Sequence, residues 1–355
     1  MWMSSYKKLV IKNVNMSLNN INCESIFQAF SKQNILIIGD VMVDAYLFGK
    51  VDRISPEAPV PIVAVKRRDN RLGGAANVAL NVKSLGGTPY LCSVVGNDDK
   101  GMLFFELMKS NNINTEGIEV CDDRITTTKF RIIGNTAQML RVDEETDVLL
   151  DAQTTELLFN RIKTIIDNKK IDVIIFQDYD KGVITHKLIE IVVALARSKN
   201  IKITVDPKKR NFNNYCNVDL FKPNLKELLE GVKSDISPKN IQELLSIVVP
   251  FQKKSGCKHF MITMSEKGAL ISTMDGERTT YHHVDAHLRN IADISGAGDT
   301  MISVASMCLA NNMSAEDIVK ISNVAGGIVC EYVGVVPVDK EVFYNEITRL
   351  LGSGS

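Results

Sequence analysis

Residues 293–300 of the 355-residue chain read DISGAGDT, and a run with helical character, Met301 to Ala310, follows directly. Gly296 and Gly298 allow the backbone to turn tightly into a helix start, where unpaired N–H groups and the positive end of the helix dipole can hold an anion. Asp299 falls in the first helical turn. A carboxylate there repels phosphate unless it faces a hydroxyl that must lose a proton, so the segment indicates a general base for phosphoryl transfer. The alternative is that Asp299 only caps or charges the helix start.

Two common phosphate motifs do not fit this segment. In a dinucleotide-binding turn a third glycine or an alanine is needed after G-x-G, but Asp299, Thr300 and Met301 stand there. The G-x-x-x-x-G-K-[ST] pattern of a phosphate-binding loop occurs nowhere in the chain. The segment therefore predicts an anion site of a different kind.

Short apolar runs and helical patterns alternate along the chain. The run ILII at residues 35–38 ends in Gly39-Asp40, as expected for a strand that is buried on both faces of a parallel sheet. Similar runs occupy residues 90–95, 173–176, 201–205 and 260–263, and helical patterns occupy residues 75–85, 101–110, 154–168 and 186–198. We expect an α/β fold with an open, mostly parallel central sheet and helices on both faces.

Two segments break this alternation. Residues 60–65 and 126–142 have strand character with no helix within them, and the second folds back at Gly134-Asn135, a dipeptide that suits a tight hairpin turn. We expect a small antiparallel β element, a lid or a dimerisation flap, built from about residues 45–66 and 125–142. Its exposed strand edges predict a homodimer.

The predicted lid carries three basic residues. Lys129 and Arg131 share one face of a strand because side chains alternate, and Arg141 lies on the other strand of the hairpin. Together they would suit a dianionic phosphate, and Lys208 is a further candidate. The alternative is that these cations are solvated and protect an edge strand from aggregation.

Composition limits the class of protein. Lys and Arg number 42 and so do Asp and Glu, so the formal charge is zero and no generic nucleic-acid or membrane-surface binder is expected. The seven scattered cysteines contain no C-x-x-C pair, and no stretch approaches 18 uninterrupted apolar residues, so we expect a cytoplasmic protein without disulfides or a membrane span. We expect a polar N-terminal extension at residues 1–33, one large domain at 34–351, and a flexible tail or cloning remnant at 352–355.

The GAGDT element, together with GGAAN at residues 73–77, resembles the ribokinase (PfkB) family of sugar kinases over roughly residues 34–351. Within that family, IGDVMVD at 38–44, RISPEAPVP at 53–61 and DYDKG at 178–182 resemble the kinase half of the ADP-heptose synthase proteins. The resemblance implies a ribokinase-like fold with a β lid, and a sugar kinase that uses ATP and Mg²⁺.

The resemblance also implies roles for individual residues. Asp299 would be the base, and the backbone amides of Gly296, Ala297 and Gly298 would form the anion hole. Sugar hydroxyls would be bound by Asp40 or Asp44 with Gly73, Gly74 and Asn77. The nucleotide would be bound by Asn224, Glu227, Thr263, Ser265, Gly268, Gly298 and Asn323, with Glu227 reaching Mg²⁺ through water.

Simpler interpretations stay open for several of these residues. Asn224 followed by Glu227 is also a capping box at a helix start. Asp40 could hydrogen-bond local turn amides, and Asn77 with Asn81 could form a solvated helix face.

The predicted reaction is phosphorylation of a small-molecule sugar phosphate, D-glycero-D-manno-heptose 7-phosphate, at its anomeric O1, a step toward ADP-heptose for lipopolysaccharide. Because no H-x-G-H occurs in the chain, we expect the kinase step without a nucleotidyltransferase step. The alternatives are a ribokinase-like kinase for another sugar or sugar phosphate, and a sugar-binding regulator that has lost turnover.

Overall fold

A computed structural model describes residues 22–135, 137–235, 237–286 and 289–352. Its centre is a nine-stranded sheet with the order β13-β12-β11-β10-β9-β8-β1-β4-β5. The strands are β1 (Asn34–Gly39), β4 (Thr88–Gly96), β5 (Ile118–Cys121), β8 (Val173–Gln177), β9 (Lys202–Asp206), β10 (Leu220–Phe221), β11 (His259–Thr263), β12 (Ala269–Asp275) and β13 (Arg278–Val284). Neighbouring strands from β5 to β11 are parallel, and β12 and β13 add an antiparallel edge. The expected mostly parallel sheet is confirmed.

Helices cover both faces of this sheet, and the side chains of strand β1 alternate between two buried clusters. Ile35 and Ile37 of β1 belong to one cluster, and Leu36 and Ile38 belong to the other. The first cluster includes residues from α1 (Cys23–Phe30), α2 (Ala75–Ser84), α3 (Asp99–Ser110), α8 (Ala297–Ala310), α9 (Ala315–Val329) and α10 (Lys340–Gly352). The second includes residues from α4 (Ala152–Asn168), α5 (His186–Ser198), α6 (Leu225–Val232) and α7 (Ile241–Ser255).

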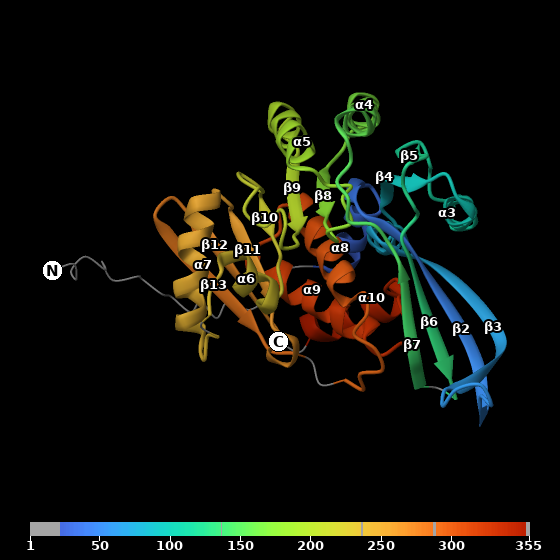
Figure 1. Cartoon of the computed structure of the whole chain (residues 1–355). Helices are drawn as coiled ribbons and strands as arrows, with labels where there is room; N and C mark the ends of the chain where they lie inside the picture. The colour runs from blue at the N-terminus through green and yellow to red at the C-terminus, as the bar shows by residue number, and fades with distance from the viewer. Residues whose placement is uncertain (1–21, 136, 236, 287–288, 353–355) are drawn as a thin grey trace.

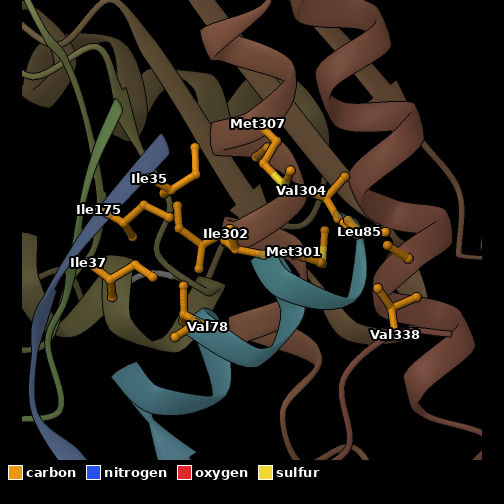
Figure 2. Close-up of a cluster of buried hydrophobic side chains, with 14 of the residues drawn as sticks. Ile35, Ile37, Val78, Leu85, Ile175, Met301, Ile302, Val304, Met307 and Val338 are labelled. Carbon is orange, nitrogen blue, oxygen red and sulfur yellow. The ribbon is translucent and has the colours of Figure 1, made fainter. Parts of the chain in front are cut away.

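The first cluster fixes the helix that carries the predicted base. Figure 2 shows Ile35 and Ile37 beside Ile175, with Val78 of α2 and Ile302 of α8 packed against them. Ile302 is fully buried, so α8 cannot move along the sheet without opening a cavity in the core. This packing holds the first turn of α8 near the carboxyl ends of the parallel strands, the edge at which such sheets bind ligands.

A second sheet of four strands has the order β3-β2-β6-β7 and extends away from the central sheet (Figure 1). Its strands are β2 (Val41–Ile54), β3 (Pro61–Gly74), β6 (Thr128–Gly134) and β7 (Ala137–Glu144). β2 with β3 and β6 with β7 form antiparallel hairpins, whereas β2 and β6 run parallel. This sheet, called the lid below, matches the expected small β element, but its first hairpin is longer than the expected residues 45–66.

The N-terminal boundary differs from the expected one at residue 34. Helix α1 buries Ile26, Phe27 and Phe30 in the core, and the ring centroids of Phe27 and Phe343 of α10 lie 5.6 Å apart. The folded unit therefore includes residues 23–33, because the apolar spacing within Cys23–Phe30 is that of an amphipathic helix. Residues 1–21 and 353–355 of the expected extension and tail lie outside the described residues. In the described part of the chain, no helix has the length and apolar character needed to cross a bilayer.

Candidate active site

Helix α8 begins at an open anion site. Gly296 adopts φ 84° as the N-cap, a left-handed conformation that favours glycine, and among the described residues no side chain caps this helix start. Gly296, Ala297, Gly298 and Asp299 line a cavity of about 1290 Å³. The Ala297 N–H donates to the carbonyl of Ile294 at 3.4 Å, so in the described part of the chain the backbone amides of Gly298 and Asp299 are the ones available to a ligand in this cavity.

Asp299 is buried at this helix start, with 3% of its surface exposed. Its Oδ2 accepts a hydrogen bond from Asn77 Nδ2 at 2.8 Å, and its Oδ1 accepts from Tyr179 Oη at 2.5 Å and Gln177 Nε2 at 3.2 Å. Burial raises the pKa of Asp299 to about 6, and the hydrogen bonds from Asn77 and Tyr179 limit the rise. A carboxylate with a raised pKa that is still charged at neutral pH suits a general base.

The residues predicted to bind nucleotide come together in one place. All of them line the cavity in front of α8: Asn224, Glu227, Thr263, Ser265, Gly268, Gly298 and Asn323. Asn224 and Glu227 also form the capping box of α6, with both hydrogen bonds at 2.8 Å. The capping interpretation is therefore confirmed, and the same two residues face the cavity.

Several cationic residues line this cavity, among them Lys208 and Lys222. Lys208, predicted on the sugar-phosphate side, lines the cavity and forms an ion pair with Glu227. The sequence interpretation gave no role to Lys222, which is buried and whose Nζ lies 2.9 Å from Asp206 Oδ2. A Cβ on Gly298 would lie 3.7 Å from both of these atoms, so the buried pair lies directly beside the first turn of α8.

The residues predicted to bind sugar hydroxyls lie on the other side of Asp299, where β2 and β3 leave the central sheet. A Cβ on Gly73 would lie 2.2 Å from Asp44 Oδ2, and Gly74 adopts φ 60° against the carbonyl of Asp40. Only glycine fits both positions. Asn77 is buried in the first turn of α2 and bonds to Asp299, so it is not on a solvated helix face.

Asp40 serves a loop in this structure. Its buried carboxylate accepts backbone N–H groups from Tyr179, Lys181 and Val183 at 2.8–3.2 Å. Burial raises the pKa of Asp40. The amides belong to the loop after β8, distant in sequence from the expected local turn, so Asp40 fixes the segment that carries Tyr179.

Each predicted lid cation has a carboxylate partner. Arg131 forms an ion pair with Asp44, and Lys129 Nζ lies 3.0 Å from both Asp143 and Glu145. Arg141 Nε lies 3.0 Å from Asp143 and its side chain is 52% exposed. Arg131 and Arg141 are direct cross-strand neighbours, so an anion at this face would meet both guanidinium groups but would compete with bound carboxylates.

Sequence reasoning missed two residues that contact Asp299. Tyr179 lay within a segment that was singled out, but its hydroxyl was given no role, and Gln177 was not considered. Gln177 Nε2 bonds to Asp299 and, at 3.3 Å, to Asp206 Oδ2. Gln177 and Asp206 each end a strand of the parallel sheet, and this strand-end position is the signal that could have found them.

The described residues contain no group of three or more His, Cys, Asp or Glu side chains arranged to hold a metal. The oxygens of Glu227 contact Lys208 and the backbone amide of Asn224. These oxygens do not form a site that coordinates a divalent cation directly. They fit Mg²⁺ that keeps its water shell and is bound mainly by nucleotide phosphates.

Comparison with known proteins shows the family to which the chain belongs. The profile of the pfkB family of carbohydrate kinases matches residues 32–341. The bifunctional protein HldE of Methylobacillus flagellatus is 36% identical over 313 residues, which cover 88% of this chain and 63% of that protein. HldE of Syntrophotalea carbinolica is 34% identical over 332 residues, covering 94% and 66%. The chain therefore spans less than two thirds of the length of these relatives.

Solved structures of the same fold are more distant in sequence. Phosphofructokinase-2 of Escherichia coli in complex with potassium superposes with a TM-score of 0.72 at 17% identity, covering 90% of this chain and 99% of that one. A ribokinase of Arabidopsis thaliana complexed with ribose and ATP superposes with a TM-score of 0.66 at 14% identity, covering 90% and 98%. These likenesses show a ribokinase-like fold. With the family profile matching 310 of its residues, from 32 to 341, the chain belongs to the pfkB family of carbohydrate kinases.

Proposed function

We propose that this sugar kinase transfers the γ-phosphoryl group of ATP to the anomeric O1 of D-glycero-D-manno-heptose 7-phosphate. The product would be heptose 1,7-bisphosphate, a step toward ADP-heptose for lipopolysaccharide core or related glycans. The observation that carries the reaction type is the position of Asp299. It lies between the cavity at the start of α8 and the glycine-lined region beside the lid, with a hydrogen bond to Asn77 on that second side.

In this proposal Asp299 takes the proton of the anomeric hydroxyl as its oxygen attacks the γ-phosphorus. The bond from that phosphorus to the bridging β–γ oxygen breaks, and ADP leaves. The first-turn amides of α8 stabilise charge on the transferred group. Lys208 and Lys222 bring positive charge to the cavity wall, and a general base of this kind is typically worth about 10² to 10⁴ in rate.

Mg²⁺, carried by the nucleotide, would neutralise charge on the β- and γ-phosphates. The chain's own contribution there is Glu227, held by Asn224 and Lys208 at the cavity wall. We propose that Glu227 orients water around the ion and does not bind it directly.

The choice of heptose 7-phosphate rests on sequence. The segments RISPEAPVP at 53–61 and DYDKG at 178–182 resemble the kinase half of ADP-heptose synthases, and the similarity to the HldE proteins covers most of the chain. The basic face of the lid around Arg131 and Arg141 supports a phosphorylated acceptor.

The test measures ADP release with a coupled assay. Mg²⁺-ATP is supplied with each of four sugars in turn: heptose 7-phosphate, ribose, fructose and fructose 6-phosphate. We expect turnover on heptose 7-phosphate alone. Asp299→Asn should lower kcat by about 10² to 10⁴ while ATP affinity, measured by calorimetry, stays within about 3-fold. Asp317→Asn is the matched control, because Asp317 is a buried carboxylate in the first turn of the next helix, α9.

Other outcomes select the alternatives. Turnover on a different sugar keeps the chemistry and discards the substrate. ATP and sugar binding without turnover on any sugar selects the regulator.

We also propose a homodimer that forms through the lid. Large apolar side chains are exposed on its strands, among them Val65, Leu140 and Val142, and an uncovered apolar sheet face favours association. Light scattering at micromolar protein should give twice the chain mass, and Leu140→Glu should give a monomer. A monomeric wild type contradicts this proposal.

A further inference from the structure

Tyr179 contacts the predicted base from a loop that is fixed at several points. Its backbone N–H donates to Asp40, as do those of Lys181 and Val183. Asp178, the residue before it, accepts from Tyr215 Oη at 2.8 Å and from Asn211 Nδ2 at 3.1 Å. A buried carboxylate that binds three amides of one loop leaves that loop little freedom, so the Tyr179 hydroxyl has a defined position.

The hydrogen bonds to Asp299 divide unequally between its two oxygens. Oδ1 accepts from both Tyr179 and Gln177, and Oδ2 accepts from Asn77. A carboxylate oxygen has about two acceptor sites. Counting the donors that the described residues provide, Oδ1 is therefore filled, whereas Oδ2 keeps one site for a further donor.

The free site lies on the side where the acceptor sugar is proposed to bind. Asn77, which contacts Oδ2, lies in the first turn of α2, the helix that begins directly after the Gly73-Gly74 pair beside Asp44. Tyr179, which contacts Oδ1, lines the cavity proposed for the nucleotide, and Lys208 Nζ lies 5.3 Å from the centre of its ring. The two oxygens of Asp299 thus face different halves of the site.

We propose that Tyr179 is a positioning residue, which holds Oδ1 of Asp299 so that Oδ2 is the atom that receives the proton of the acceptor hydroxyl. This inference rests on the proposed function, in which Asp299 is the base. Tyr179 does not itself take the proton. Without its hydroxyl, Oδ1 regains an acceptor site and the carboxylate can rotate, so the attacking hydroxyl is bound by either oxygen and misaligned with the γ-phosphorus.

Other groups near Asp299 stay in place when the Tyr179 hydroxyl is removed. Asp206 raises the pKa of Asp299 and Lys222 lowers it, both through charge, while Asn77 donates a neutral hydrogen bond. Lys208, close to the Tyr179 ring, also interacts electrostatically with Asp299. Loss of the phenol donor removes one stabilising contact to the charged form, so the pKa of Asp299 should rise.

The experiment compares Tyr179→Phe with Tyr215→Phe. Tyr215 is buried and Tyr179 is half-buried at the cavity wall. Each donates a phenolic hydrogen bond to a buried carboxylate, but Tyr215 donates to Asp178 and not to Asp299. Two readouts are used. The first is the pH dependence of kcat with heptose 7-phosphate, or with whichever sugar of the panel turns over. The second is ¹³C NMR titration of the free enzyme labelled at aspartate Cγ, with the Asp299 signal assigned from Asp299→Asn.

For Tyr179→Phe we expect kcat to fall about 10- to 100-fold with little change in KM for ATP. The acidic limb of the kcat–pH profile and the NMR titration midpoint of Asp299 should both move to higher pH. Tyr215→Phe should move neither, because the three amide bonds to Asp40 and the Asn211–Asp178 bond still hold the Tyr179 loop. An unchanged acidic limb in Tyr179→Phe, or an equal shift in both variants, overturns the inference. Failure of the proposed function would look different: Asp299→Asn would keep its turnover, or no sugar would be phosphorylated. In either case the NMR titration of the free enzyme still tests whether Tyr179 holds Asp299.

Discussion

The two sides of Asp299 differ in how their charged groups are arranged. On the cavity side, the helix start of α8 is uncapped among the described residues, and the predicted nucleotide residues all line one open space. On the lid side, Asp44 is bound by Arg131, and Lys129 and Arg141 share Asp143. Lys208 and Lys222 on the cavity side are also paired with carboxylates, so the difference is the uncapped helix start, which offers an anion backbone amides that no side chain of the described residues binds.

This difference has an energetic consequence. A phosphate that enters the cavity can be bound by backbone amides in the first turn of α8 without breaking an ion pair. A phosphate that binds at the lid must displace carboxylates that are already paired with the same cations. Its net binding free energy is therefore smaller. We therefore expect variants on the cavity side to have the larger effects.

The largest effect is expected for Lys222→Met. Lys222 and Asp206 form a buried ion pair, and removal of one partner leaves an uncompensated buried charge. The free energy of unfolding, from urea denaturation, should fall by about 3 kcal/mol. The double variant Lys222→Met/Asp206→Asn should recover most of this loss. Equal stability of wild type and Lys222→Met would show that the pair is effectively solvated.

A smaller effect is expected on the lid. Arg131→Gln should raise KM for the sugar phosphate about 10-fold, because a charged hydrogen bond to the acceptor and the pair with Asp44 are both lost. KM for ATP should stay unchanged. Arg141→Gln is the control, since its pair with Asp143 is half-exposed and contributes little. If Arg141→Gln has the larger effect on KM, the phosphate binds further out along the lid than proposed.

The pH dependence of the rate separates Asp299 from a second buried carboxylate. With the pKa of Asp299 raised to about 6, kcat at pH 5 should be about a tenth of its plateau, because the base is protonated below its pKa. Burial and the charge of Asp40 raise the pKa of Asp178 to about 7, but Asp178 does not line the cavity. Asp178→Asn should therefore keep the acidic limb of the profile, and its loss in that variant would contradict the assignment of the limb to Asp299.

Much of the fold and of the cavity side was predictable from the sequence, since both depend on local patterns. Apolar runs marked β1, β8 and β9, and the glycines at 296 and 298 marked the start of α8. The ion pairs of the lid were not predictable, because Arg131 and Asp44 are 87 residues apart and meet only through the parallel pairing of β2 with β6. Tyr179 was missed for the same reason: its contact with Asp299 spans 120 residues.

The passage from β1 to β2 has a consequence for how related sequences can vary in length. Only Asp40 separates the two strands, so the lid takes its register directly from the central sheet. One inserted residue at this point would turn Asp44 and Tyr46 to the opposite face of β2. The connection between Ile54 and Pro61, at the far end of the same hairpin, has no such constraint. Insertions and deletions in relatives should therefore collect at the tip of the lid and be absent at its base.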